Sequence, residues 1–332
     1  MSELRKDPVI GRWVIIATER ARRPGNFIDT STYTDGHDDP RSCPLCHIQK
    51  TPVCTMGTVS VVTCESFPSP EAGKPYQRNH GLYEIVAGMG VQETVIETPD
   101  HVANMADLNT GQIRLVLETY VQRFRALKEN ASLKYIFAYK NYGTSDSGPL
   151  VAHAHSHVMA TAVKPLHVKE KLAGAKEYYD AHKRCIYCDL IRQEIKEQKR
   201  VIFETEHFIA VTPFAARFLF ELWILPKRHH CDFADGLEGT AADLARMLKV
   251  ILQKIKMGLD DPAYNFIIQT APEKGEVSSE VKWETLEADY HWHIELTPQL
   301  TRMAGFEKGT GFYICAIPPE DTAEYLREAE IP

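Results

Sequence analysis

Apolar side chains recur at steps of three and four residues in two long stretches of the chain. The first stretch carries Ile113, Leu117, Tyr120, Phe124 and Leu127, and the second carries Leu244, Leu248, Ile251 and Ile255. This spacing places the apolar side chains on one side of a helix, so each stretch predicts an amphipathic helix. The two predicted helices start 131 residues apart.

Shorter runs rich in β-branched and aromatic residues flank these helices and predict strands. They cover residues 13–17, 134–140 and 155–163 in the first half, and residues 201–211, 265–270 and 291–297 in the second. Residues 169–182 predict a charged helix near the boundary between the two halves of the chain. Because each half combines one long helix with short strands, we expect an α+β fold with an antiparallel sheet in each half.

Cysteines and histidines repeat in one order along both halves. A C-x-x-C pair is followed by a strand-like run that ends in histidine, then by the helix and an H-x-H pair. The residues are Cys43, Cys46, His101, His153 and His155 in the first half and Cys185, Cys188, His229, His291 and His293 in the second. Corresponding features lie 142, 128, 131 and 138 residues apart. This order predicts a duplicated module, with domains at residues 1–168 and 169–332.

The repeated residues are typical metal ligands. Zinc prefers thiolate and imidazole ligands in a closed tetrahedron. The sequence therefore predicts two zinc sites, one formed by Cys43, Cys46, His101 and His153 and the other by Cys185, Cys188, His229 and His291. His230 is a rival for His229, and participation of Glu170 or His293 would make iron possible at the second site. Redox-active cysteine pairs and inert thiols remain the alternatives.

His153, His155 and His157 alternate with small residues, so a strand would place all three imidazoles on one face. A neutral imidazole is a competent nucleophile toward phosphorus when its other nitrogen is held by a hydrogen bond. Attack at an α-phosphate would form a nucleotidyl-histidine. Asn141 and Gly148 belong to a polar, turn-prone region that could present donors to phosphate oxygens. A plain surface strand or a further metal site are the alternatives.

Composition and charge narrow the class of protein. The chain has 332 residues, of which 44% are apolar, and its 38 basic and 45 acidic residues give a formal net charge of −7. The chain can therefore fill a substantial core, and it lacks the basic balance of a non-specific nucleic-acid binder. It contains no apolar run long enough to span a bilayer, and its start is polar. We expect a cytoplasmic protein without membrane or nucleic-acid partners.

Several segments together resemble galactose-1-phosphate uridylyltransferases. Residues 153–159 resemble the histidine-triad motif, while the duplicated metal framework, residues 13–24 and residues 291–311 resemble that family. The resemblance covers nearly the whole chain. It implies two tandem histidine-triad-like modules that form an intramolecular pseudo-dimer. It also implies ping-pong transfer through a covalent histidine, with a nucleotide-sugar donor and a hexose 1-phosphate acceptor, in a homodimer.

The resemblance also implies roles for individual residues. His155 matches the family's nucleophile, and His153 matches a zinc ligand beside it. The further substrate contacts that it implies are Arg20, Arg23, Phe306, Glu307 and Gly309.

Three positions depart from the family's pattern. His157 stands where the family normally has glutamine, Pro149-Leu150 replaces a small polar residue, and residues 65–68 replace an Asn-Lys-Phe-Pro-like segment. A histidine at 157 could protonate a leaving group or help to activate water, so it joins His155 as a candidate catalytic residue besides contacting substrate.

The leading hypothesis is uridylyl transfer from UDP-glucose to a hexose 1-phosphate such as galactose 1-phosphate. Three rivals remain. The first is a phosphorylase that transfers the adenylyl group of ADP-glucose or a dinucleoside polyphosphate to phosphate. The second is a nucleotide hydrolase, and the third is a zinc-stabilised binding protein without turnover.

Overall fold

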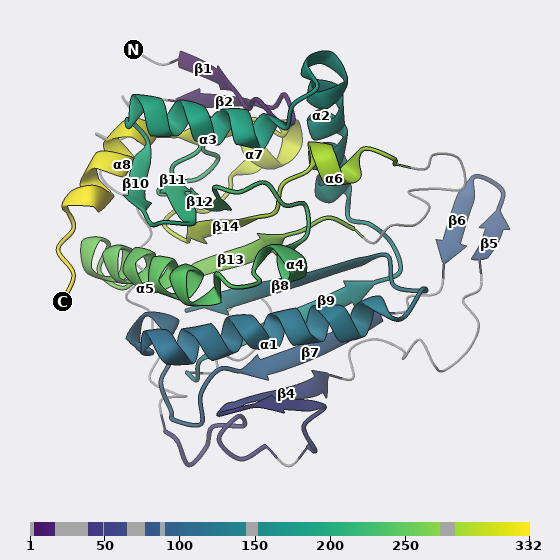
Figure 1. The fold of residues 1–332 in the computed structure, drawn as a ribbon, viewed down its shortest axis with the longest axis vertical. Coiled ribbons are helices and arrows are strands. Elements are labelled where there is room, and N and C mark those ends of the chain that lie inside the picture. The colour runs from purple at the N-terminus through teal and green to yellow at the C-terminus, as the bar shows by residue number, and fades with distance from the viewer. Residues whose placement is uncertain are drawn as a thin grey trace.

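A computed structural model describes residues 3–16, 39–48, 50–64, 77–86, 90–143, 152–272 and 283–332. One ten-stranded sheet runs through both halves of the chain (Figure 1). Its strands are β3 (Cys54–Met56), β4 (Val59–Cys64), β7 (Gly90–Ile96), β8 (Tyr135–Tyr142), β9 (His155–Thr161), β10 (Val201–Glu204), β11 (Phe208–Val211), β12 (Leu222–Pro226), β13 (Tyr264–Gln269) and β14 (His293–Pro298).

The strand order is the same in both halves when it is followed outward from the centre. The full order is β10-β11-β12-β14-β13-β8-β9-β7-β4-β3, and every pair in it is antiparallel. The central strands β8 and β13 join the halves, with Tyr139 opposite Ile267. The predicted α+β class with antiparallel sheets is confirmed, and the duplicated order of sequence features corresponds to a duplicated order of strands.

Two long helices cover one face of this sheet. They are α1 (Thr110–Lys128) and α5 (Ala241–Gly258), and all nine apolar positions that predicted them are buried. Their side chains share one core cluster with the helix-facing residues of the sheet, among them Val95, Val158 and Ile294. Figure 1 shows the two helices in front of the sheet, running roughly along its strands. The predicted helices are therefore confirmed, and burial of their apolar side holds both halves to the same sheet.

The opposite face of the sheet differs between the halves. In the second half it packs against α2 (Leu166–His182), α3 (Ile186–Glu197) and α6 (Leu286–Asp289), which contribute to a separate apolar cluster with Trp223 and Leu225. In the first half, His155 and His157 lie on this face, and we call it the open face.

Smaller elements complete the described chain. They are β1 (Glu3–Lys6), β2 (Trp13–Ile16) and β15 (Tyr313–Cys315) in a second sheet, the hairpin of β5 (Gln77–His80) and β6 (Tyr83–Val86), the short helices η3 (Met105–Asp107), α4 (Phe233–Gly236) and α7 (Gly305–Thr310), and α8 (Pro319–Glu328). None of the helices in the described ranges has the length and apolar character needed to cross a lipid bilayer.

The prediction of one strand over residues 201–211 is wrong. The structure has two antiparallel strands there, β10 and β11, joined by a tight turn. Thr205 closes the turn, since its backbone nitrogen donates to the carbonyl oxygen of Phe208 at 2.9 Å and its hydroxyl accepts from the Phe208 nitrogen at 3.1 Å. A hydroxyl side chain that bonds to the nearby backbone in this way competes with a continuous strand.

Candidate active site

The candidate nucleophile lies at the start of β9, between β7 and β8. The strand register places Ile96 opposite His155, and both Thr94 and Tyr139 opposite His157. The two imidazoles share the open face, with ring centroids 5.4 Å apart. Because β9 begins at His155, His153 precedes the strand, and its ring faces a cysteine pair instead.

His155 is held with one ring nitrogen facing the backbone. Its Nδ1 atom lies 2.7 Å from the carbonyl oxygen of His153, so Nδ1 carries a hydrogen and donates it. Nε2 has no hydrogen-bond partner among the described residues. Burial, followed by the positive charge of Lys140, lowers the pKa of His155 below its ordinary value. The unprotonated Nε2 of a neutral imidazole is the atom that can attack phosphorus.

His157 is enclosed on two sides. Its Nδ1 atom lies 3.3 Å from the hydroxyl oxygen of Thr94, and its ring lies 5.1 Å from the ring of Tyr139 at an interplanar angle of 31°. Burial, and then the neighbouring His155 and Lys140, lower the pKa of His157 to about 4. The side chain is therefore neutral near pH 7, and it offers a hydrogen-bond donor rather than an acidic proton.

A buried ion pair supports the start of β9 from the helix-covered side. The ammonium group of Lys140 donates to the carboxylate of Glu97 and to the carbonyl oxygen of His155, both at 2.8 Å. Sequence reasoning missed this pair. The sequence does contain a hint, because Lys140 falls at a position where the alternation of β8 otherwise places apolar side chains, such as Ile136 and Ala138.

The first Cys₂His₂ cluster brings together the predicted set. The ligand atoms of Cys43, Cys46, His101 and His153 all lie within 4.8 Å of one another. The Sγ atom of Cys46 is 3.3 Å from Nδ1 of each histidine. His153 directs Nε2 at the carbonyl oxygen of Thr98, 2.8 Å away, which leaves its Nδ1 lone pair for a metal ion. Two thiols and two imidazoles in this arrangement could hold a metal ion.

The second cluster repeats this construction with Cys185, Cys188, His229 and His291, again within 4.8 Å. Here Nε2 of His229 faces the carbonyl oxygen of Glu287 and Nε2 of His291 faces that of Pro226, each at 2.9 Å. The hydrogen bond from Cys185, and then those from His229 and His291, lower the pKa of Cys188 below its ordinary value.

The rival ligands of the second cluster lie elsewhere. Glu170 pairs with His167 at 3.0 Å, and the ring of His293 contacts the rings of Tyr187 and Trp223. His230 is not part of the group whose ligand atoms converge. The donor set around the second cluster therefore contains sulfur and nitrogen and no carboxylate among the described residues.

The first cluster has a direct link to the candidate nucleophile. His153 contributes its ring to the cluster, and its carbonyl oxygen accepts the hydrogen bond from His155. A metal ion bound by four protein ligands leaves no coordination position for substrate. The cluster can therefore position the candidate nucleophile, and a metal ion held there would have no direct contact with substrate.

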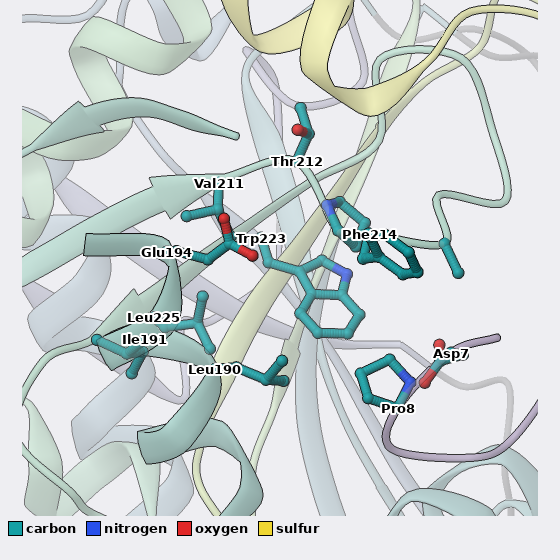
Figure 2. A pocket seen from close by; sticks show the side chains of 12 residues that line it. Asp7, Pro8, Leu190, Ile191, Glu194, Val211, Thr212, Phe214, Trp223 and Leu225 are labelled. Atoms are coloured by element: carbon teal, nitrogen blue, oxygen red, sulfur yellow. The ribbon is translucent and has the colours of Figure 1, made fainter. Parts of the chain in front are cut away.

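In the second half, the imidazole equivalent to that of His155 belongs to His293, and it is buried. The ring of Tyr187 from α3 lies 4.9 Å from that of His293. Glu295 stands where the first half has His157, and it pairs with Lys171 at 2.6 Å and Arg217 at 3.2 Å. Figure 2 shows a small pocket next to this region. Its lining is mostly apolar and includes Leu190 and Ile191 of α3 and Trp223 and Leu225 of β12. Only the first half presents an accessible histidine pair within the described residues.

Among the other predicted substrate contacts, Asn141 lies on β8 near the histidine pair, and the rest lie on α7 or outside the described chain. Asn141 is exposed on β8, two residues beyond Tyr139. Phe306, Glu307 and Gly309 lie on α7, where Glu307 accepts a hydrogen bond from the backbone of Ala304. Figure 1 shows α7 well away from β9. Arg20, Arg23, Gly148, residues 65–68 and Pro149-Leu150 fall outside the described residues.

The duplicated sheet, the histidine pair on β9 and the two Cys₂His₂ clusters define a two-domain nucleotidyltransferase. Residues 1–165 match the family model for the N-terminal domain of galactose-1-phosphate uridyl transferase, and residues 171–317 match the model for its C-terminal domain. The chain therefore belongs to the galactose-1-phosphate uridyl transferase family.

Individual relatives cover the whole chain. An ADP-glucose phosphorylase from Arabidopsis thaliana is 35% identical over 99% of this chain and 93% of the relative. A galactose-1-phosphate uridylyltransferase from Thermotoga maritima is 29% identical over 100% of this chain and 99% of the relative. Among solved structures, the Arabidopsis thaliana ADP-glucose phosphorylase with bound ADP-glucose superposes with a TM-score of 0.80 at 31% identity, covering both chains completely.

Proposed function

We propose that this protein transfers the adenylyl group of an ADP-sugar such as ADP-glucose to inorganic phosphate. The observation that carries the proposal is the greater identity to the ADP-glucose phosphorylase than to the uridylyltransferase over the same length of chain. It favours the adenylyl alternative over our first expectation of uridylyl transfer.

The reaction would proceed in two displacement steps. Nε2 of His155 attacks the α-phosphorus, the bond to the bridging oxygen breaks, and glucose 1-phosphate leaves with that oxygen and its electron pair. An oxygen of inorganic phosphate then attacks the same phosphorus, the N–P bond breaks, and ADP leaves the restored imidazole. The Nδ1 hydrogen bond to the His153 carbonyl stabilises the positive charge that develops on the ring during attack.

His157 would serve as a donor to a phosphate oxygen. Its pKa of about 4 keeps it neutral, as a glutamine would be at the same position. This supports group transfer over the hydrolase alternative, which needs a group that can deliver or accept a proton near neutral pH.

Zinc is the metal that we propose for both clusters. Two thiolates and two imidazoles form a closed tetrahedral set that suits zinc, and among the described residues no carboxylate that would favour iron joins either cluster. Bound zinc would fix the local backbone and supply no chemistry to the substrate.

The remaining substrate contacts are proposed from the family resemblance. Asn141 is exposed beside the histidine pair and could donate to the nucleotide. The other proposed contacts are Arg20, Arg23, Gly148, Phe306, Glu307 and Gly309. We also propose a homodimer, in which α7, well away from β9 in its own chain, could approach the histidine pair of a second copy. Sedimentation velocity at several protein concentrations tests this assembly.

Uridylyl transfer from UDP-glucose to a hexose 1-phosphate is the second candidate. It is favoured by the match of both halves to the domain models of galactose-1-phosphate uridyl transferase. The two candidates share His155 and the covalent step, and they differ in the base of the donor and in the acceptor.

Intact-protein mass spectrometry separates the candidates. The protein is exposed briefly to ADP-glucose or UDP-glucose, with the His155→Gly variant as control, and the adduct is then chased with phosphate, galactose 1-phosphate or buffer alone. An AMP adduct that needs His155 and is released as ADP by phosphate supports the proposal. A UMP adduct released by galactose 1-phosphate supports the second candidate. An adduct that persists in the His155→Gly variant refutes the assignment of the nucleophile.

A further inference from the structure

Three neighbouring strands place Cys64, Thr94 and His157 in a row on the open face. Thr94 lies opposite His157 between β7 and β9, and Cys64 lies on β4, which pairs with the other edge of β7 (Figure 1). The hydroxyl oxygen of Thr94 is 3.3 Å from Nδ1 of His157 and 3.0 Å from the sulfur of Cys64. The hydroxyl group therefore links the thiol to the imidazole.

The direction of the two hydrogen bonds follows from the strength of the acceptors. A hydroxyl has one hydrogen to donate, and an imidazole nitrogen accepts it far better than a thiol sulfur does. Thr94 therefore donates to Nδ1 of His157, and the S–H of Cys64 donates to the hydroxyl oxygen of Thr94. A neutral imidazole carries a single N–H, so an accepting Nδ1 places that hydrogen on Nε2.

The surroundings hold His157 in this state. The imidazole is neutral near pH 7, because burial lowers its pKa to about 4. Tyr139 packs against the ring from β8. Nε2 has no hydrogen-bond partner among the described residues, so it is available to a bound nucleotide.

The second half lacks this arrangement. Trp223 on β12 lies opposite Glu295 in the same way that Thr94 on β7 lies opposite His157. An indole group has no hydroxyl and can only donate through its ring nitrogen. The hydroxyl therefore occurs at this strand position in the half that carries the accessible histidine pair.

We propose that Thr94, oriented by Cys64, is a positioning residue that selects the Nε2–H tautomer of His157 for hydrogen bonding to the nucleotide. This role rests on the proposed nucleotidyl transfer at His155. A neutral Nε2–H group gives a phosphate oxygen the same kind of donor as the side-chain amide of glutamine. Thr94 thereby accounts for the presence of histidine at a position where the family normally has glutamine.

The test compares Thr94→Val, which keeps the shape and removes the hydroxyl, with Thr94→Ser, which keeps the hydroxyl. Side-chain ¹⁵N NMR of the metal-loaded protein reports the tautomer, and the signals of His157 are identified by their loss in His157→Gln. We expect Thr94→Val to move hydrogen from Nε2 toward Nδ1 and to lower kcat for nucleotidyl transfer about tenfold. Thr94→Ser should keep the tautomer and most of the rate. Cys64→Ala should give a smaller shift in the same direction.

A double-mutant cycle shows whether Thr94 acts through His157. A glutamine amide needs no tautomer selection, so Thr94→Val should change kcat less than about twofold in the His157→Gln background. An unchanged tautomer in Thr94→Val, or an equal loss of kcat in both backgrounds, would overturn the proposal. Melting temperature and zinc content identify a variant that merely loses its fold. If Thr94→Val is such a variant, the tautomer and kcat of Thr94→Ser decide the outcome.

Failure of the proposed function would look different. If ADP-glucose gives no adduct with the unmodified protein, the proposal of adenylyl transfer is refuted. The tautomer measurement needs no substrate, so it still tests the role of Thr94. The kinetic cycle is then run with UDP-glucose.

Discussion

His155 and His293 occupy equivalent positions in the two halves of the protein, and each directs Nδ1 at the carbonyl oxygen of the histidine two residues before it. The distances are 2.7 Å for His155 and 3.0 Å for His293. The same local backbone therefore holds both imidazoles in the same orientation. They differ in access, because His293 is fully buried and its ring lies against the ring of Tyr187.

This difference predicts one nucleotidyl group per chain. The His293→Ala variant should form the covalent adduct to the same extent as the unmodified protein, because no phosphate can reach a buried imidazole without unfolding its cover. Intact-protein mass spectrometry after exposure to the donor nucleotide measures the stoichiometry. Two adducts per chain in the unmodified protein would contradict the assignment of a single active half.

The two metal clusters should differ in their effect on catalysis. We expect Cys46→Ser and Cys188→Ser each to lower the zinc content by about one ion per chain. Only Cys46→Ser should lower kcat, by about tenfold or more, because His153 links the first cluster to the nucleophile. Elemental analysis and steady-state kinetics well below the melting temperature measure the two effects. Equal losses of kcat in both variants would argue against a link through His153.

The buried pair of Lys140 and Glu97 should stabilise the fold strongly. Lys140→Met leaves the carboxylate of Glu97 buried without its cation, and we expect a loss of about 3–5 kcal/mol in the free energy of unfolding. The exposed pair of Arg114 and Glu118 provides a matched control, since Arg114→Met should cost less than about 0.5 kcal/mol. Urea denaturation measures the free energy of unfolding of both variants. Similar losses in the two would refute the claim that the buried pair stabilises the fold more than the exposed pair.

The low pKa of His157 predicts a specific dependence of stability on pH. The unfolded chain binds a proton at this residue below a pH of about 6.5, whereas the folded protein does so only below about 4. The free energy of unfolding should therefore fall as the pH is lowered from about 6.5 to about 4. His157→Gln removes this contribution, so the variant should lose roughly 2 kcal/mol less than the unmodified protein across this window. Both proteins retain the metal clusters, so the difference between their free energies of unfolding, measured by urea denaturation at each pH, isolates the contribution of His157. The same dependence on pH in both proteins would contradict the lowered pKa.

Sequence periodicity and spacing determined a large part of this structure. The steps of three and four predicted α1 and α5, because a helix buries one side whatever it packs against. The repeated order of cysteines and histidines predicted both groups of four residues whose ligand atoms converge. Such patterns are local, or are copied from one half to the other, so they are visible along the chain.

Tertiary structure alone decided which half leaves its histidines accessible and how these histidines are held. Thr94 and Cys64 are 63 and 93 residues from His157 in the sequence, and strand pairing brings the three together. Lys140 reaches Glu97 across 43 residues. The cover over His293 depends on how α3 packs on the sheet. These contacts arise from strand register and from the packing of one element on another, which the order of residues along the chain does not specify by itself.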